Sequence, residues 1–360
     1  MTQTVQVDKA NLADMQVVTR DSVALAEGAV RLAVESFSVT ANNITYAVIG
    51  DMFGYWHFFP GDGGKGIVPM WGHAIVEASN HADIVVGERL YGYLPMASHL
   101  DILPGKISAG GLTDMAEHRQ PMSPFYNQYS RLATDPEHDP AREDARMIFG
   151  PLFKTGFLIE SMFARGDWFG AEQMVLTSAS SKTAMALAHC AKSASPQIKR
   201  IGLTSAGNVG FVQKSALYDQ VLAYGDLETL PKARSVSVDF AGNAAVLGRI
   251  HAHFADDLAY SCLVGVTHVD ARGTGLGDGG ALAGAAPILF FAPDYATALI
   301  KDIGVQAFAQ AISARWHSFI ERADHFMRVD RRSGLHAAVG AFGDTLAGKA
   351  DPAIGIVIVP

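Results

Sequence analysis

The second half of the chain alternates short apolar runs with amphipathic stretches, and this alternation limits the fold more than any other feature. The strand-like runs are Gln173–Thr177, Ile198–Thr204, Val236–Gly242 and Ser261–His268. Between them, Ala184–Lys192 and Asn208–Leu217 have the apolar spacing of helices. Short buried strands that alternate with helices form parallel sheets with both faces covered. We therefore predict a doubly wound parallel α/β domain in this half.

The first part of the chain has a different pattern. Val30–Val39, His73–Ser79 and Glu88–Leu94 alternate apolar and polar residues or are rich in β-formers. Residues 101–146 contain five prolines and a charge-rich end, which predicts loops. A β-rich domain with a loop-like extension is therefore expected before the α/β domain.

Composition excludes several classes of protein. The 360 residues include 28 Lys and Arg against 36 Asp and Glu, a net charge of −8, and 49% are apolar. Such a chain can bury a large core, and its acidic balance argues against nucleic-acid binding. With only Cys190 and Cys262, a disulfide framework or a four-cysteine zinc site is not expected. The N-terminal sequence lacks a signal-peptide pattern and no uncharged run spans a bilayer, so we expect a cytoplasmic protein without membrane contact.

Several stretches, in the same order, resemble the medium-chain dehydrogenase/reductase superfamily, in its zinc-free, quinone-oxidoreductase-like branch. The stretches that carry the resemblance are Val39–Gly50, Pro69–Ser79, Val85–Tyr93, Asp219–Tyr224 and Val238–Gly242. PLFKTGFLIE, TSASSKTA and ILFFAP also resemble an uncharacterised branch of this superfamily that is known only as a domain of unknown function.

The resemblance implies a division of the chain into domains. It implies a GroES-like catalytic domain over residues 1–150, with a long insertion at 101–146. A Rossmann-type NADP(H)-binding domain is then expected over 151–300, followed by a return to the catalytic domain over 301–360. Superfamily members often dimerise through edge strands of the cofactor domain, which implies a homodimer with Ser261–His268 at the seam.

Histidine spacing does not indicate a metal site. Zinc-dependent relatives carry Gly-His-Glu and a cysteine ligand, whereas here Ala74 follows Gly72-His73 and no cysteine lies near Asn43. We predict that His73 is a strand residue rather than a ligand. His251 and His253 would point apart on a helix, so we predict ordinary surface histidines and no zinc.

The candidate cofactor loop lies between the first strand and the first helix of the α/β domain. It lacks the usual glycines, but small hydroxyl residues and one lysine can approach and bind phosphate oxygens. A phosphate loop of NTPases is not expected, because Leu176 and Ser181 stand where its glycines belong. A capped helix without cofactor is the alternative. The expected pyrophosphate contacts are Ser178, Ser180, Ser181, Lys182 and Thr183.

The end of the next strand predicts the type of cofactor. Gly202–Asn208 contains no acidic residue, whereas NAD-binding proteins usually carry an acid there for the ribose 2′-hydroxyl. Small hydroxyl residues leave room for a 2′-phosphate, which favours NADP(H). The residues expected near it are Thr204, Ser205 and Asn208, and either Lys182 or Lys214 could supply the positive charge. The resemblance adds Thr155, Gly242, Gly265, Val266 and Thr267 as cofactor contacts.

One literal glycine fingerprint, Gly275–Gly280, follows the strand that ends at His268. Pro287 prevents a helix soon after it, so we predict a loop and not a second cofactor motif. The equivalent region of related enzymes lies near the nicotinamide, which makes a lid a further hypothesis.

Without zinc, a reductase needs hydride from nicotinamide and a proton donor near the substrate. The resemblance suggests Asn43, Tyr46 and Tyr55 as catalytic residues, with His57 close by. The alternative is that this segment forms only an aromatic wall, suited to a flat or acyl substrate. That wall would consist of Phe53, Tyr55, Trp56, Phe58 and Phe59.

Three functional hypotheses follow from these patterns. The leading one is a zinc-independent NADP(H)-dependent reductase of an activated alkene, quinone or ketone, including acyl thioesters. The second is a lyase or isomerase of the same fold that uses nicotinamide transiently. The third is a non-catalytic binding protein. A titration with NADPH and NADH separates the third hypothesis from the other two.

Overall fold

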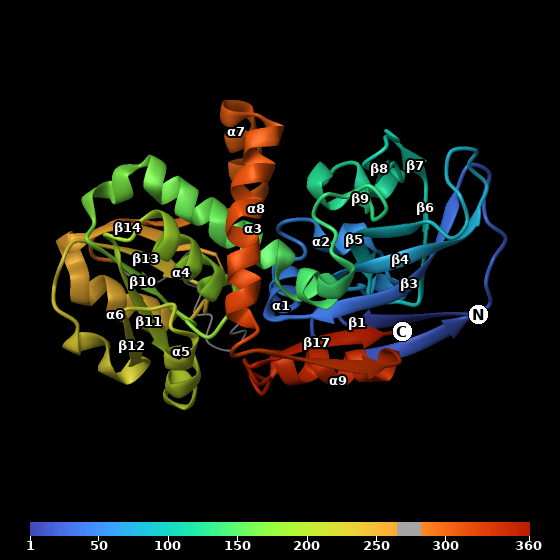
Figure 1. Ribbon diagram of the computed structural model, residues 1–360. Coiled ribbons are helices and arrows are strands. Elements are labelled where there is room, and N and C mark those ends of the chain that lie inside the picture. Colours follow the sequence, from blue (N-terminus) through green and yellow to red (C-terminus); the bar gives the residue numbers. More distant parts are fainter. Residues whose placement is uncertain (265–281) are drawn as a thin grey trace. The chain divides into compact units, whose positions relative to one another are not determined.

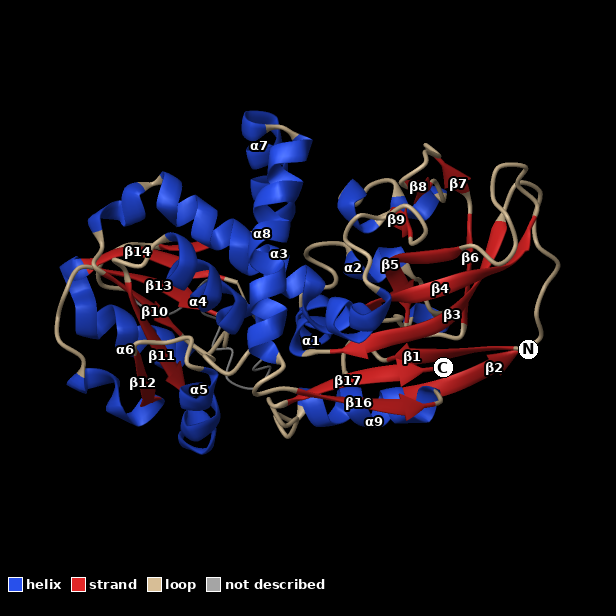
Figure 2. Ribbon diagram, in the orientation of Figure 1, coloured by secondary structure: helices blue, strands red, loops and turns tan. Residues whose placement is uncertain are grey.

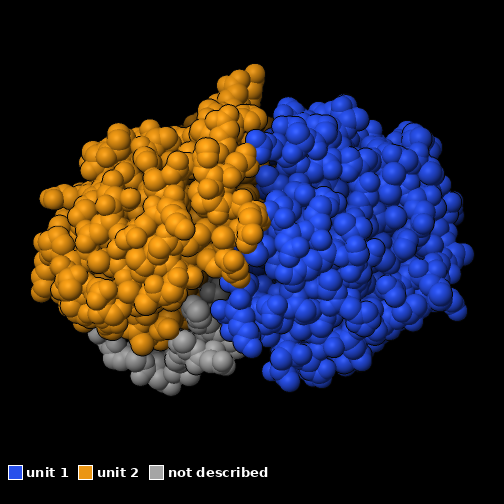
Figure 3. Space-filling model, turned by 60° about the horizontal axis from the view of Figure 1, so that its bottom comes forward, with its two compact units in different colours: residues 1–148, 329–350, 354–360 blue, residues 149–328, 351–353 orange. Residues whose placement is uncertain are grey.

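The computed structural model describes residues 1–264 and 282–360, and these form two compact units. Unit 1 contains residues 1–148, 329–350 and 354–360. Unit 2 contains residues 149–328 and 351–353 (Figure 3).

Unit 1 is built mainly from antiparallel strands (Figure 2). A separate pair consists of β1 (Thr2–Val7) and β2 (Met15–Arg20). The strands of the larger, nine-stranded sheet are β3 (Val30–Val39), β4 (Pro69–Ser79), β5 (Arg89–Pro95), β6 (His99–Ile102), β7 (Pro104–Gly105), β8 (Gly111–Asp114), β9 (Gln128–Arg131), β16 (Arg328–Ser333) and β17 (Ile354–Val359). Its order is β16-β17-β3-β4-β5-β9-β8-β7, and β6 also pairs with β3.

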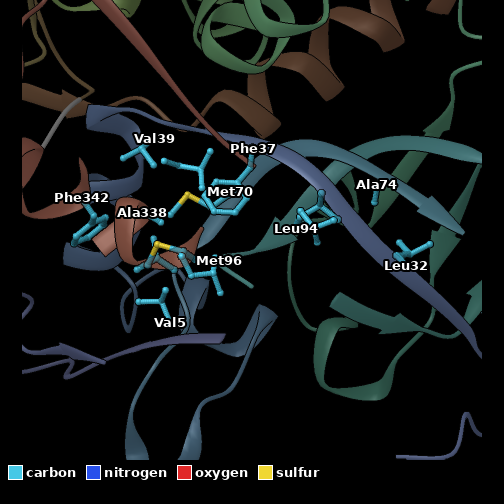
Figure 4. Packing of buried hydrophobic residues seen from close by; sticks show 14 of the residues in the cluster. Val5, Leu32, Phe37, Val39, Met70, Ala74, Leu94, Met96, Ala338 and Phe342 are labelled. Carbon is cyan, nitrogen blue, oxygen red and sulfur yellow. The ribbon is translucent and has the colours of Figure 1, made fainter. Parts of the chain in front are cut away.

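The helices of unit 1 are α1 (Ala41–Val48), α2 (Tyr55–Phe58) and α9 (Leu335–Leu346), with the short 3-10 turns η2 (Glu117–Arg119) and η3 (Pro124–Tyr126). The main core lies between α9 and the strands, where Phe342 of α9 packs near Val39, Met70 and Met96 (Figure 4). Close pairing of β3 and β4 requires Gly72, because a Cβ there would lie 2.3 Å from the Ser36 carbonyl oxygen.

The segment 101–146 differs from the expected loop. It contains the short strands β7, β8 and β9, and the helix α3 (Glu143–Arg165) begins inside it. Strands of two to four residues are too short to produce a recognisable period of two, so the sequence alone does not reveal them.

Unit 2 has a six-stranded parallel sheet in the order β12-β11-β10-β13-β14-β15. The strands are β10 (Gln173–Leu176), β11 (Lys199–Thr204), β12 (Gln220–Ala223), β13 (Ser235–Asp239), β14 (Leu258–Leu263) and β15 (Pro287–Leu289). When the six strands are numbered in chain order, with β10 as strand 1, their order across the sheet is the 3-2-1-4-5-6 of a doubly wound dinucleotide fold. The predicted fold class, a β-rich domain combined with a doubly wound parallel sheet, is therefore confirmed.

The helices of unit 2 are α4 (Lys182–Ala194), α5 (Val209–Ser215), α6 (Ala244–Phe254), α7 (Ala292–Ile303) and α8 (Val305–Ala323), together with most of α3. Helix α6 buries Ile250 and Phe254 against Val175 and Ile201 of the sheet. Helices α3 and α4 approach closely at Gly156, where a Cβ would lie 2.6 Å from the Leu187 amide nitrogen.

Gly304 has φ +84°, which ends α7 and separates it from α8 (Figure 1). One expectation for this unit differs from the structure. The return to unit 1 begins at Val329 rather than at residue 301, because α8 packs in unit 2. Its Phe319 lies 5.2 Å, ring to ring, from Phe153 of α3.

Of the expected dimer seam, Ser261–His268, the structure describes only residues 261–264. Residues 261–263 lie in β14, which is hydrogen-bonded to β13 on one side and β15 on the other, so β14 is not an edge strand. Among the described strands, β15 lies at that end of the sheet.

One helical segment of the described chain, Pro140–Arg165, is long and apolar enough to cross a membrane. The sequence expectation missed it because charged residues interrupt the apolar run. Most of the segment is buried inside the fold, which is typical of a core helix in a globular protein.

Candidate functional site

The loop between β10 and α4 forms a tight turn without glycine. Ser178 has φ +47°, and the Ala179 amide donates to the Leu203 carbonyl of the neighbouring strand. Ser181 is the N-cap of α4, and its hydroxyl accepts from the Ala184 amide at 3.3 Å. The positive end of α4 therefore lies at the carboxyl end of β10, where the strand order reverses and doubly wound sheets bind ligands.

Three predicted residues from two loops meet beside this turn. The Ser180 hydroxyl oxygen accepts from the Asn208 amide at 3.3 Å and lies 3.5 Å from the Thr204 hydroxyl. Ser205 follows Thr204 and is exposed. The structure thus joins the pyrophosphate candidates to the candidates for the ribose end of the cofactor.

Lys182 is the first residue of α4 and is half-buried. Burial lowers the pKa of its ammonium group to about 8, and the carboxylate of Asp351 opposes this shift. Thr183 follows in the same turn and is also half-buried. A partly desolvated cation beside a helix N-terminus is a favourable partner for a phosphate.

The other predicted cofactor contacts lie outside the loop between β10 and α4. Lys214 is exposed in the last turn of α5, at the opposite end of that helix from Asn208. Thr155 donates its hydroxyl to the Pro151 carbonyl within α3. Gly242 has φ +66° in the loop after β13. Gly265, Val266, Thr267 and the glycine fingerprint Gly275–Gly280 lie outside the described residues.

Sequence reasoning missed three side chains that fix these loops. The Tyr224 hydroxyl accepts from the Ser178 amide at 2.8 Å, and the Tyr218 hydroxyl donates to the Ala179 carbonyl at 2.8 Å. The buried Asp239 carboxylate accepts from the Thr177 hydroxyl at 2.5 Å and from the Ala241 amide at 3.0 Å. Tyr224 and Asp239 lie in stretches that carried the family resemblance, but only the pairing of the strands reveals these bonds.

A cluster of aromatic side chains lies in unit 1, and we call it the aromatic cage. It consists of Tyr46 on α1, Tyr55 and Phe58 on α2, Trp71 on β4 and Tyr93 on β5. Trp71 and Tyr93 are cross-strand neighbours, which places their rings on one face of the sheet 5.1 Å apart. Tyr46 lies 4.6 Å from Tyr55 and 5.4 Å from Tyr93, ring to ring.

Some hydroxyl groups of the cage have hydrogen-bond partners and one has none. The Tyr46 hydroxyl accepts from Trp71 Nε1 at 3.1 Å, and the Tyr55 hydroxyl lies 3.2 Å from that of Tyr126. The Tyr93 hydroxyl is buried without a hydrogen-bond partner. Burial raises the pKa values of Tyr46, Tyr55 and Tyr93 above 10, so these phenols remain protonated at neutral pH.

The four catalytic candidates from the sequence separate in the structure. Tyr46 and Tyr55 lie in the cage, but His57 is exposed. Asn43 is buried and committed to structure, because it accepts from the Thr40 amide and donates to the Pro69 carbonyl. Trp71 and Tyr93 were missed because their alternation also fits an ordinary strand.

The aromatic wall expected from sequence is only partly correct. Phe53, Tyr55, Phe58 and Phe59 belong to one cluster. Trp56 packs into the main core instead, since the four-residue helix α2 turns it to the other side.

The histidines follow the sequence expectation only in part. His73 is a buried residue of β4, both ring nitrogens lack hydrogen-bond partners, and burial lowers its pKa to about 3. His251 is not a surface residue, because it is buried and bonds to the Ser261 hydroxyl and the Ala283 carbonyl. Over residues 1–264 and 282–360, no group of three His, Cys, Asp or Glu side chains could hold a metal ion.

The two units together define the fold of the medium-chain dehydrogenase/reductase superfamily, as the sequence resemblance indicated, and solved structures share it over the whole chain. CurA from Vibrio vulnificus in complex with NADPH has a TM-score of 0.64 at 14% identity, covering 100% of this chain and 99% of that one. The quinone oxidoreductase of Pseudomonas syringae pv. Tomato DC3000 gives 0.57 at 15% identity, with 100% of both chains covered. The yhdH oxidoreductase of Salmonella enterica in complex with NADP gives 0.54 at 12%, again covering 100% of both.

The chain belongs to the family described as "Protein of unknown function (DUF2855)", whose profile matches residues 37–351. No curated protein sequence matches the chain. At 12–15% identity, the solved structures establish the fold and leave the activity to be argued from the chain's own residues.

Proposed function

We propose that this protein is a zinc-independent, NADP(H)-dependent reductase of an activated alkene, quinone or ketone, acting in the cytoplasm. The observation that carries the proposal is the loop of Ser178–Thr183 at the switch point of a 3-2-1-4-5-6 sheet. A helix N-terminus, hydroxyl groups and a partly desolvated lysine meet there, which suits a pyrophosphate. Structures of the same fold that hold NADPH or NADP support this assignment.

Nicotinamide would supply hydride when bound, and the protein must then stabilise the substrate oxygen or donate a proton. Buried phenols suit the stabilisation of the oxygen, because a protonated hydroxyl can donate a hydrogen bond to it. Tyr46, Tyr55 and Tyr93 of the aromatic cage are the donors that we assign to this role.

One observation favours a non-catalytic binding protein as the second candidate. Three loop amides already have partners inside the protein: Ser178 donates to Tyr224, Ala179 to Leu203 and Ser181 to Ser178. Fewer amides are then available to a pyrophosphate than in a glycine-rich loop.

A fluorescence titration of the purified protein with NADPH and NADH decides between the two candidates. The reductase predicts binding of NADPH at micromolar concentration and its oxidation with a member of a panel of enones, quinones and acyl thioesters. Absence of binding below millimolar NADPH and NADH would leave the serine-rich loop as a helix cap. Binding without NADPH oxidation, but with turnover of a substrate, would instead indicate the lyase or isomerase.

Replacing Ser205 with aspartate is expected to shift cofactor preference toward NADH by at least about tenfold. A carboxylate at the end of β11 repels a 2′-phosphate but can accept from a ribose 2′-hydroxyl. Ser205→Asn serves as the control, because asparagine has nearly the same size as aspartate but carries no charge. Equal effects of both variants on NADPH binding would show that Ser205 does not face the 2′-phosphate.

Activity is expected to survive prolonged treatment with EDTA, with well under one zinc ion per chain by elemental analysis. The reason is that, over the residues that the structure describes, no group of three His, Cys, Asp or Glu side chains could hold a metal ion. Stoichiometric zinc whose removal abolishes turnover would contradict this prediction.

The protein is expected to form a homodimer through β15. Ile288 and Leu289 are 46% and 42% exposed on this short terminal strand of the described sheet, so pairing with a second copy would cover both the strand edge and its apolar side chains. Ile288→Lys should therefore shift the protein from dimer to monomer in light scattering. A monomeric wild type at micromolar concentration would refute this assembly.

A further inference from the structure

The ring of Tyr126 occupies the middle of the aromatic cage. Its centroid lies 4.8 Å from that of Tyr93, 5.5 Å from Phe58 and 5.6 Å from Tyr55. Trp71 and Tyr46 follow at 6.2 and 6.3 Å. Tyr126 comes from η3, within the segment 101–146, whereas the cage residues come from α1, α2, β4 and β5. One surface segment thus inserts a phenol ring into a cage that other elements build.

Tyr126 is attached differently at its backbone and at its side chain. The buried guanidinium of Arg119 donates to the Tyr126 carbonyl at 2.8 Å, which fixes the backbone. The side chain has one hydrogen bond in the cage, to Tyr55, and is half-buried. Since the side chain reaches solvent and the backbone is fixed separately, a rotation about the Cα–Cβ bond would carry the ring out of the cage without moving the backbone.

The cage contains hydrogen-bond donors that Tyr126 does not satisfy. Tyr93 is fully buried, and its hydroxyl has no partner. The Tyr46 oxygen accepts from Trp71 and from the Asn42 side chain, so its own hydrogen is left to donate. A buried hydroxyl without a partner is uncommon in folded proteins and indicates a missing acceptor. A ring with a carbonyl oxygen would supply that acceptor.

The absence of charge on the cage residues restricts which rings the cage can bind. The cage residues are uncharged, and the Arg119 guanidinium, 5.5 Å from the Phe58 ring, is neutralised by the Asp114 carboxylate at 2.7 Å. A charged ligand would lose its hydration without gaining a partner. The cage therefore favours a neutral, planar ring.

We propose that Tyr126 is a removable plug and that the aromatic cage binds a neutral planar ring bearing a carbonyl oxygen, with Tyr93 donating to that oxygen. The inference rests on the proposed function, because it assigns the substrate class of the reductase. The closed plug lowers the apparent affinity for the ring by the fraction of molecules in which the cage is open.

Binding of duroquinone, measured by calorimetry without any nucleotide, tests the proposal. Its four methyl groups block addition by nucleophiles, and durene is the matched ring without oxygens. Wild type should bind duroquinone weakly, and Tyr126→Phe should bind it about 2- to 10-fold tighter, since the plug loses its hydrogen bond to Tyr55. Tyr126→Ala should bind at least about tenfold tighter than wild type. Tyr93→Phe should weaken duroquinone binding about 2- to 10-fold and leave durene unchanged.

The variants also define what would overturn the proposal. If duroquinone bound only to Tyr126→Ala and not to wild type or Tyr126→Phe, the truncation would have created an artificial cavity. Equal affinities of wild type and Tyr126→Phe would mean that the bond to Tyr55 does not hold a plug, and this comparison remains available if the alanine variant does not fold. An unchanged affinity of Tyr93→Phe would exclude the assigned donor. Because nucleotide is absent, ring binding and NADPH binding can fail independently of each other.

Discussion

Replacement of Lys182 by methionine is expected to weaken NADPH binding about 10- to 100-fold. Methionine keeps the apolar stem and removes only the charge. A hydrogen bond between charged groups contributes about 1.5–3 kcal/mol, and about 1.4 kcal/mol corresponds to one decade in affinity. Lys182 is the first residue of α4, where the pyrophosphate is expected, so NADH binding should weaken by a similar factor.

The matched control for this variant is Lys199→Met. Lys199 is exposed at the start of β11, at the opposite end of the strand from the loop, and its replacement changes the net charge equally. It should alter NADPH affinity less than about twofold. Equal affinities of wild type and Lys182→Met would contradict a phosphate contact, and a loss confined to NADPH would place Lys182 at the 2′-phosphate instead.

The lowered pKa of Lys182 also predicts a pH dependence. Below pH 8 the unliganded protein already carries the charge that a phosphate needs. Above pH 8 the free protein must take up a proton on binding, so wild-type affinity should fall by up to about tenfold per pH unit. Lys182→Met should lack this decline. Parallel titrations of both proteins at pH 7, 8 and 9 measure the difference.

The stability of the unliganded protein should depend on pH in the opposite direction to its affinity for NADPH. Lys182 binds its proton with a pKa of about 8 in the folded protein and 10.5 as its ordinary value. Between these values the unfolded chain binds more protons, so this group makes the unliganded protein more stable as pH rises through that window. At pH 7 the charged side chain costs stability, and Lys182→Met should unfold at a higher temperature than wild type without cofactor.

Replacement of Arg119 by leucine is expected to cost about 3–5 kcal/mol of unfolding free energy. Arg119 is 1% exposed and donates to Asp114, Asn127, Tyr129 and the Tyr126 carbonyl. Removing one member of a buried ion pair leaves the other charge without compensation, and this dominates the loss. Urea denaturation followed by near-ultraviolet circular dichroism measures the change.

A double variant separates the charge effect from lost packing. Asp114→Asn removes the uncompensated charge and keeps an oxygen for the Leu103 and Ala116 amides, which Asp114 Oδ1 accepts in the wild type. Arg119→Leu combined with Asp114→Asn should therefore be more stable than Arg119→Leu alone. A single-variant loss below about 1 kcal/mol, or no recovery in the double variant, would contradict this account.

Local patterns determined the architecture of unit 2 and the location of its loop. Four predicted strands correspond to β10, β11, β13 and β14, because buried parallel strands leave continuous apolar runs. The order of strand, serine-rich loop and helix then placed Lys182 at an N-terminus. Ser181 caps α4, and this cap is compatible both with a cofactor loop and with the alternative of a capped helix without cofactor.

The sequence determined less about unit 1 because its site depends on contacts between distant segments. Tyr46 and Tyr55 were identified through resemblance, but nothing in the chain order indicates that Trp71, Tyr93 and Tyr126 join them. The pairing of β4 with β5 brings the first two together, and the fold of 101–146 brings the third.

What the sequence by itself determined is therefore the order and type of the main elements, since hydrophobic period is a local property that each segment carries alone. What only the tertiary structure decided is burial and pairing. His251 is buried because β14 and the segment at Ala283 close over α6, and the return to unit 1 begins at Val329 because α8 packs on α3. These outcomes depend on which surfaces meet after folding, and a linear pattern does not contain that information.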